Sequence, residues 1–273
     1  MRASSPLLAI VMLGVLAVAG CGGNKVKGDG PPSGSTRIPD MPGDAVPRPE
    51  PRSRYGNGPV YEVLGQRYTV MPSSSGYQER GVASWYGKKF HGNLTSNREV
   101  YDMYAMTAAH KTLPLPTYVR VRNLSNNKSI IVRVNDRGPF VHNRIIDLSY
   151  SAAMKLDMIK DGTSLVEVTA INFDQTSGDR PTSAKSSSPR PPVDTRNKLY
   201  VQVGAFGERS NAERRLGELS LAGIGDAFIH EEHAADRVLY RVRIGPVADV
   251  VQYDVIVDSL EAMGINDPYL INE

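Results

Sequence analysis

The first region with a regular alternation of apolar and polar residues predicts a set of short β-strands. Residues 118–122 and 165–170 alternate, and residues 129–134 form a run rich in β-branched side chains. Asn126-Asn127 separates the first of these segments from the run and predicts a hairpin there. Several short strands of this kind are typical of a small closed barrel.

One helix is predicted within the same region, over residues 149–156. Ser149 can cap its N-terminus, and Ala152, Ala153 and Leu156 fall on one face of the helix. That face has the spacing needed to pack against the strands.

The second region repeats one β-α-β pattern at an offset of 41 positions, as from Val201 to Val242. Ser210 and Glu213 have capping-box spacing in the first copy, and Asp249 and Gln252 have it in the second. Seven structural positions match at this offset: Val201, Val203, Gly204, Leu219, Gly223, Ile224 and Phe228 align with Val242, Ile244, Gly245, Leu260, Gly264, Ile265 and Tyr269. The repeat predicts a ferredoxin-like β-α-β-β-α-β sandwich.

Stretches rich in Gly, Pro and Ser divide the chain. They predict a disordered tether over residues 21–54 and an interdomain linker over 174–197, which leaves folded domains at 55–173 and 198–273. The chain has 32 basic and 29 acidic residues, a formal net charge of +3, and no basic run. Nucleic acid is therefore not an expected partner.

Residues 1–20 have the composition of an export signal. An apolar run over 7–19 follows Arg2 and is too short to span a bilayer. The string Val18-Ala19-Gly20-Cys21 resembles a bacterial lipobox, which implies cleavage before Cys21 and attachment of lipid to its thiol. Because Gly rather than Asp follows the cysteine, we expect a lipid-anchored protein of the outer membrane that faces the periplasm. An ordinary secretory signal is the alternative.

Several strings occur in order in the first folded region: GVASWYG, FHG, YDM, AAHKTLP and VNDRGPF. Together they resemble the rare lipoprotein A (RlpA) family, whose central domain is a double-psi β-barrel. The C-terminal strings YVQVGAF and YRVRIGP resemble a SPOR domain. The resemblance implies a mainly β plus α+β chain, in which a six-stranded double-psi β-barrel is joined by a linker to a β-α-β-β-α-β SPOR domain.

The resemblance implies a lytic transglycosylase that cleaves the MurNAc-GlcNAc bonds of peptidoglycan and leaves 1,6-anhydro-MurNAc ends. In such a reaction one carboxyl group acts first as an acid and then as a base. Carried over to this sequence, the catalytic residues are Asp136, Glu99 and His110. Asp136 is the expected acid. Glu99 is expected to favour protonated Asp136, stabilise the oxocarbenium or orient the sugar hydroxyl, and His110 to bind a carboxylate or the sugar.

Five further residues are expected to contact substrate. Trp85, Tyr86 and Phe90 can stack on sugar rings, and Lys111 and Arg137 offer cations. Arg137 is expected to point away from Asp136, since pairing with it would weaken the acid. On residue type alone, Asp136 is more often a turn former or part of a surface ion pair, and Glu99 a surface carboxylate. His110 is more often a structural histidine, and Trp85 and Tyr86 are more often core residues.

In the C-terminal domain, Gln202, Arg241 and Arg243 alternate with apolar neighbours, and Phe206 ends the first strand. These four are the expected glycan-binding residues, with an ordinary solvated sheet face as the alternative. SPOR domains bind glycan strands stripped of stem peptides, which are abundant at division septa. We therefore expect denuded peptidoglycan as the partner, enrichment at the septum, and septal ring proteins as further partners.

Two other functions fit the same residues. The first is a non-catalytic, expansin-like glycan-binding protein, and the second is a hydrolase that uses Asp136 and Glu99 with water. One departure from the family favours the non-catalytic alternative: Arg98 precedes Glu99, where the family usually has Gly. No metal or cofactor is expected, since the five histidines and the single cysteine show no ligand spacing.

Overall fold

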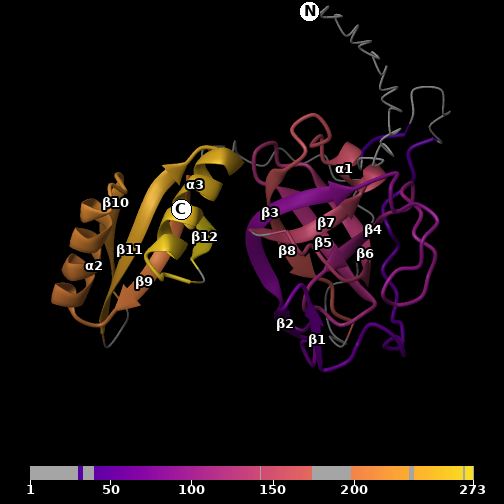
Figure 1. The fold of residues 1–273 in the computed structure, drawn as a ribbon, viewed down its shortest axis with the longest axis horizontal. Coiled ribbons are helices and arrows are strands. Elements are labelled where there is room, and N and C mark those ends of the chain that lie inside the picture. The colour runs from indigo at the N-terminus through magenta and orange to yellow at the C-terminus, as the bar shows by residue number, and fades with distance from the viewer. Residues whose placement is uncertain are drawn as a thin grey trace, which may run out of the picture.

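The computed structural model describes residues 30–32, 40–141, 143–173, 198–233, 237–266 and 268–272. They form a β-barrel, indigo through magenta to salmon in Figure 1, and an α+β domain, orange to yellow. The predicted leader, Cys21 and the predicted linker lie outside the described residues. Within the described ranges, no helix has the length and hydropathy to cross a membrane. The same ranges contain no group of three His, Cys, Asp or Glu side chains arranged to hold a metal ion.

Six strands close the barrel in the order β3-β7-β4-β6-β5-β8. β3 pairs parallel with β7 and β4 with β6, while the other four neighbouring pairs are antiparallel. The six-stranded barrel predicted from the sequence is confirmed. The strands are β3 (Gln78–Tyr86), β4 (Thr107–His110), β5 (Thr117–Asn123), β6 (Ser129–Asp136), β7 (Arg144–Ser149) and β8 (Ser164–Ala170), preceded by a hairpin of β1 (Val60–Val63) and β2 (Gln66–Thr69).

Alternation along the strands fills the barrel with apolar side chains. On β5, Val119 and Val121 are fully buried, whereas Arg120 between them is exposed. Successive side chains of a strand point to opposite faces, so one face of each strand supplies the interior. The predicted hairpin joins β5 to β6, and Asn127 adopts a φ of 60° in its turn, a conformation that Asn tolerates better than most residues.

The predicted helix is present as α1 (Tyr150–Lys155), directly after β7. Ser149 is its N-cap, since its Oγ accepts a hydrogen bond of 3.3 Å from the backbone N–H of Ala152. Ala152 and Ala153 are fully buried against the barrel, as is the C-cap residue Leu156. The cap and the buried face are therefore both confirmed.

Residues 40–58 form an extended arm along the barrel, which we call the N-terminal arm. The backbone N–H of Ala45 donates to the carbonyl of Ile131 (3.0 Å), and that of Ser53 donates to the carbonyl of Leu115 (2.8 Å). This corrects the sequence prediction, which placed the arm as far as residue 54 in a disordered tether. The arm has few apolar side chains, but the barrel satisfies its backbone polar groups.

The C-terminal domain has a four-stranded antiparallel sheet in the order β10-β11-β9-β12. Leu219 and Leu260, equivalent positions in the repeat, are fully buried in one core with the sheet. The predicted β-α-β-β-α-β order is confirmed. Its elements are β9 (Leu199–Phe206), α2 (Arg209–Leu221), β10 (Ala227–His233), β11 (Val238–Val247), α3 (Val250–Ala262) and β12 (Tyr269–Asn272).

The two helices of this domain begin differently. The Asp249 side chain caps α3 and accepts a hydrogen bond of 2.8 Å from the backbone N–H of Gln252, as the capping spacing predicts. α2 begins after Glu208, which makes no side-chain capping bond, and Ser210 lies inside the first turn. The predicted Ser210 cap is therefore wrong, because the N-cap position is Glu208, two residues earlier in the chain.

Candidate active site

Asp136 is the last residue of β6, and it is held through one carboxyl oxygen. Its Oδ1 accepts hydrogen bonds from the backbone N–H of Ser96 (2.7 Å), the Ser96 hydroxyl (2.6 Å) and the backbone N–H of Arg137 (2.8 Å). Its Oδ2 accepts none from the residues that the structure describes. The carboxyl group is therefore fixed in orientation, and its partly exposed side chain leaves Oδ2 as the atom that can exchange a proton.

A β-bulge explains why the consecutive residues Asn135 and Asp136 of β6 both contact the turn formed by residues 95–99. The register between β4 and β6 shifts by one residue at Asn135, so the strict alternation of the strand is interrupted there. Asn135 donates a hydrogen bond to Glu99 (2.8 Å), while Asp136 accepts its bonds from Ser96. Both side chains thus contact one turn, residues 95–99.

This turn is closed by its own short polar side chains. The backbone N–H of Thr95 donates to the carbonyl of Glu99 (2.8 Å), and that of Arg98 donates to the carbonyl of Thr95 (2.9 Å). The Thr95 hydroxyl also donates to Asn97 Oδ1 (2.6 Å). Thr, Ser and Asn favour turns because their side chains bond the nearby backbone. The closed turn fixes Ser96 and Glu99 relative to β6.

Glu99 is an ionised carboxylate in this site. Its Oε2 accepts from Arg133 Nη1 (2.7 Å) and from Asn135 Nδ2 (2.8 Å), and its Oε1 accepts from Asn97 Nδ2 (2.8 Å). Burial opposes ionisation, but the hydrogen bonds from Arg133 and Asn135 outweigh it and hold the pKa of Glu99 below its ordinary value. Glu99 is 41% exposed, so it can supply negative charge to a bound polymer, and it is not placed to act as the acid.

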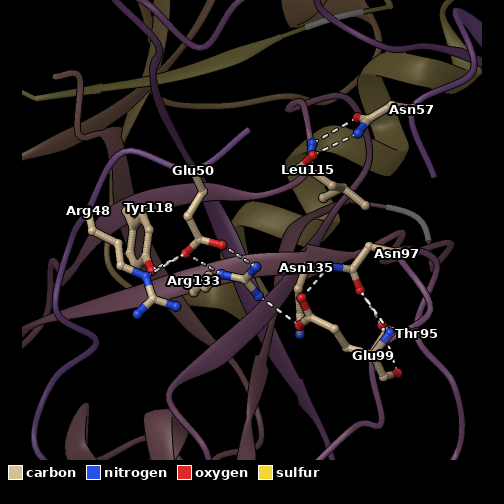
Figure 2. Close-up of polar contacts among 10 residues, drawn as sticks. All are labelled: Arg48, Glu50, Asn57, Thr95, Asn97, Glu99, Leu115, Tyr118, Arg133 and Asn135. Atoms are coloured by element: carbon tan, nitrogen blue, oxygen red, sulfur yellow. Dashed lines mark hydrogen bonds and ion pairs between the residues drawn. The ribbon is translucent and has the colours of Figure 1, made fainter. Parts of the chain in front are cut away.

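Arg133 lies between Glu99 and a second carboxylate on the N-terminal arm, as Figure 2 shows. Its Nε and Nη2 donate to the two carboxyl oxygens of Glu50, at 3.1 Å and 2.8 Å. The Tyr118 hydroxyl also donates to Glu50, at 2.5 Å. The hydrogen bond from Arg133 is the main cause that lowers the pKa of Glu50 to about 2. The site therefore contains an ion-pair chain that starts outside the barrel.

Arg98 is in the left-handed region, with a φ of 72°. Glycine adopts this conformation without strain, which gives a physical reason for the glycine usual in the family. The Arg98 guanidinium lies 5.3 Å from the ring centroid of Tyr55 on the N-terminal arm. Arg98 therefore keeps the turn conformation, and the cation paired with Glu99 is Arg133.

Among the residues that the structure describes, His110 bonds no carboxylate, and its predicted bond to a sugar stays a prediction. It is 2% exposed, and its Nδ1 accepts from the backbone N–H groups of Thr112 (3.1 Å) and Leu113 (3.0 Å). The proton is thereby assigned to Nε2, which lies 2.7 Å from the Tyr77 hydroxyl. Burial lowers the pKa of His110 to about 3, so the ring is neutral. In this structure it is a buried residue that holds the loop after β4.

Arg137 points away from Asp136, as expected, but it does not point to the substrate side. It is 9% exposed, and its Nε donates to the carbonyl of Gly56 (2.8 Å). Its Nη1 donates to the carbonyls of His110 (3.1 Å) and Leu113 (2.6 Å). A guanidinium with this many fixed donors is suited to tie loops together, and Arg137 joins the N-terminal arm to the barrel.

Lys111 lies in a different place from the carboxylates. It lines a cavity of about 630 Å³ together with Glu79 of the barrel and Tyr253 of the C-terminal domain, and neither Asp136 nor Glu99 is among the lining residues. Lys111 therefore does not share a cavity with the two carboxylates, and its predicted contact with the substrate stays a prediction.

The three predicted stacking residues differ in how far the protein covers their rings. Tyr86 is buried and stacks on Tyr101 with ring centroids 4.1 Å apart, and Trp85 packs edgewise on Tyr150 at 5.7 Å. The buried and stacked ring of Tyr86 has no free face for a sugar. Trp85 is half-buried and Phe90 is 41% exposed, so stacking of these two rings on a substrate stays a prediction.

The C-terminal sheet gathers three of its four predicted binding residues. Gln202, Arg241 and Arg243 line one hollow, which Tyr269 also lines. Arg243 Nε donates to Gln202 Oε1 (3.4 Å), and Gln202 also contacts the Tyr269 hydroxyl. Phe206 is different, because it packs against the apolar core shared with the helices. Tyr269 is an aromatic residue of this hollow, and the predicted glycan contact of the half-buried Phe206 stays a prediction.

Sequence reasoning missed four residues of the barrel site. Arg133 is a charge within a β-branched run and Asn135 is the neighbour of Asp136, so both carried a signal. Ser96 gave no sequence signal, because its contact with Asp136 depends on the closed turn. Glu50 gave no sequence signal either, because it lies in a Pro-rich stretch with few apolar side chains.

Comparisons with known proteins agree with this architecture. Residues 78–168 match the family described as "Lytic transglycolase", and residues 195–272 match the family described as "SPOR domain". A solved SPOR domain of RlpA from Pseudomonas aeruginosa is 31% identical, with a TM-score of 0.26; the match covers 28% of this chain and 99% of that one.

Relatives from several bacteria carry the name "Endolytic peptidoglycan transglycosylase RlpA". The protein of Pseudomonas aeruginosa is 38% identical over 289 residues, which cover 89% of this chain and 84% of that protein. The protein of Vibrio cholerae is 47% identical over 184 residues, which cover 65% of this chain and 68% of that protein. With the barrel, the SPOR domain and this identity over most of its length, the chain belongs to the RlpA family.

Proposed function

We propose that this protein is an endolytic transglycosylase that cleaves MurNAc-GlcNAc bonds of peptide-free peptidoglycan strands and leaves 1,6-anhydro-MurNAc ends. The observation that carries the proposal is the state of Asp136, whose Oδ1 receives three hydrogen bonds while Oδ2 receives none from the described residues. A carboxyl group oriented in this way can hold its proton only at Oδ2. The relatives' name as peptidoglycan transglycosylases supports the same reaction.

The proton of Asp136 Oδ2 goes first to the glycosidic oxygen. The bond from that oxygen to C1 of MurNAc then breaks, and positive charge develops at C1. The C6 hydroxyl of the same MurNAc attacks C1 and gives its proton to Asp136. The product is a 1,6-anhydro ring, the enzyme regains its starting proton, and no water is consumed.

Glu99 supplies fixed negative charge in this scheme. It is ionised, and the hydrogen bonds from Arg133, Asn135 and Asn97 hold it in one orientation. A preorganised charge is most effective where opposite charge develops in the transition state. We assign Glu99 the stabilisation of the oxocarbenium-like sugar and the orientation of its C6 hydroxyl.

The rest of the chain delivers the barrel to its substrate. The amide, guanidinium and aromatic groups of Gln202, Arg243 and Tyr269 suit hydroxyl-rich glycan strands, which the SPOR domain would bind at the division septum. The lipobox-like string ending in Cys21 supports a lipid anchor in the outer membrane. Linking two weak glycan-binding modules raises their effective concentration on one polymer. Cys21→Ser should move the protein from the membrane fraction to the soluble fraction, and unchanged membrane association would contradict the anchor.

Product analysis tests the activity itself. Purified protein is incubated with intact sacculi and with amidase-treated sacculi, and the released fragments are analysed by mass spectrometry. Anhydro-MurNAc ends, more abundant from the amidase-treated sample, are the expected result. New reducing ends would identify a hydrolase, and sacculus binding without any new ends would identify a glycan-binding protein.

A further inference from the structure

Glu50 on the N-terminal arm shares one guanidinium with the site carboxylate Glu99. The two oxygens of Glu50 occupy Nε and Nη2 of Arg133, at 3.1 Å and 2.8 Å, and this leaves Nη1 to donate to Glu99 at 2.7 Å. The Glu50 and Arg133 side chains are each 17% exposed. Paired donors on a carboxylate fix the guanidinium plane as well as its position. Figure 2 shows the chain of contacts from Glu50 to Glu99.

The arm holds Glu50 in place independently of this ion pair. On one side of Glu50, Ala45 donates to the carbonyl of Ile131 (3.0 Å). On the other side, the Asn57 side chain donates to the carbonyl of Leu115 (2.7 Å) and accepts from its backbone N–H (2.8 Å). Glu50 is thus anchored from both directions along the chain, unlike a surface carboxylate on a free side chain.

The charges around Glu99 come from four segments. Arg133 is on β6, where Asp136 ends the same strand, and Glu50 and Arg48 are on the arm. Tyr118 on β5 donates to Glu50, and Arg98 on the turn faces Tyr55. Without the charge of Glu50, the full charge of Arg133 would act on Glu99, the other carboxylate that it contacts. A carboxylate neutralised in this way stabilises a developing cation less well.

We propose that Glu50 is a positioning residue of the active site, which turns Arg133 so that a single N–H reaches Glu99 and which offsets the charge of Arg133. The role rests on the proposed transglycosylase function. It means that the N-terminal arm, which follows the proposed membrane anchor in the chain, contributes a residue to the active site. Glu50 itself acts through Arg133 and need not touch the substrate.

The test is Glu50→Gln, which keeps the size and the polar tip of the side chain but removes its charge. In the full-length protein, kcat on denuded glycan should fall about tenfold while KM stays within about twofold, because binding is not the step affected. The acidic limb of the kcat profile should move to lower pH. Asp44→Asn is the matched control: Asp44, on the same arm as Glu50, pairs with Lys155 of α1, so this variant weakens arm docking without touching Arg133.

Two further measurements test whether the effect of Glu50 runs through Glu99. In a Glu99→Gln background, Glu50→Gln should have no additional effect on kcat, since its path runs through Glu99. Carbon-13 NMR of the Glu99 carboxyl should show titration at lower pH in Glu50→Gln than in the wild type. The NMR result needs no activity, so it separates a failure of this inference from a failure of the proposed function. Unchanged kcat and Glu99 titration in Glu50→Gln, or equal losses in Asp44→Asn, would overturn it.

Discussion

The two site carboxyl groups have different surroundings although one turn contacts both. Glu99 is ionised because Arg133 and the amides of Asn135 and Asn97 donate to it. Asp136 receives three donors on Oδ1, whereas Oδ2 accepts no hydrogen bond from the part of the chain that the structure describes. Separate roles for two carboxyl groups follow from such differences in environment rather than from residue type.

His110 gives a direct check of the buried polar network. Since burial lowers its pKa to about 3, the ring should stay neutral at pH 5, whereas an exposed histidine is mostly protonated there. The unfolded chain takes up that proton as the pH falls below about 6.5, so the contribution of His110 to stability is lost between about pH 6.5 and pH 3. NMR of the ring carbons measures this directly, and a midpoint near 6.5 would show that the ring is not buried as described.

Arg98 tests the conformation of the 95–99 turn. Because its φ is 72°, Arg98→Gly should leave activity intact and change the free energy of unfolding by less than about 1 kcal/mol, since relief of strain offsets the lost contact with Tyr55. Arg98→Val should cost about 1–2 kcal/mol, because a β-branched residue is strongly disfavoured there. Urea unfolding of both variants gives the comparison. Equal stability of the two would contradict a left-handed residue at this position.

At the scale of single elements, β6 illustrates what the sequence could predict. Its β-branched run predicted a strand, and the strand is present as Ser129–Asp136. The bulge at Asn135 was not predictable from the run, because it depends on pairing with β4. The same limit applies to His110, whose partners come from the fold of the following loop rather than from its own string.

The prediction of a disordered tether was wrong for the N-terminal arm. Its Pro-rich composition resembles that of a linker, and it contacts the barrel through backbone hydrogen bonds and ion pairs, with Ala45 packed against the barrel core. Hydrophobic patterning cannot detect such contacts, since they leave no periodic signal. By contrast, the 41-residue repeat predicted the C-terminal topology correctly because repeated apolar positions form its core.

Docking of the arm should make stability depend on pH through Glu50. Its pKa is lowered to about 2 by Arg133, so the ion pair stabilises the folded state above the unfolded pKa of about 4.5 and loses that contribution as the pH falls toward 2. Thermal unfolding across this window should show a steeper fall in Tm for the wild type than for Glu50→Gln. Parallel curves for the two proteins would mean that Glu50 is not paired in the folded state.

At the scale of the whole molecule, the proposed function assigns cleavage to the barrel and glycan binding to the SPOR domain. Arg243→Gln should weaken binding to denuded sacculi by about tenfold, the scale of one charge-assisted hydrogen bond, and should leave cleavage of short soluble glycans unchanged. Arg214→Gln, an exposed residue of α2, is the charge-matched control. Sedimentation with sacculi measures both variants. Equal binding by Arg243→Gln and the wild type would remove this sheet face from the glycan site.

The central claim is that Asp136 transfers the proton that breaks the glycan strand, and Asp136→Asn tests it most directly. The asparagine can still accept the bonds from Ser96 and Arg137 through Oδ1, so the variant should fold and bind sacculi like the wild type. Mass spectrometry of digests of denuded sacculi should show anhydro-MurNAc ends from the wild type and a loss of at least about a thousandfold in the variant. Undiminished anhydro products from Asp136→Asn would contradict the account.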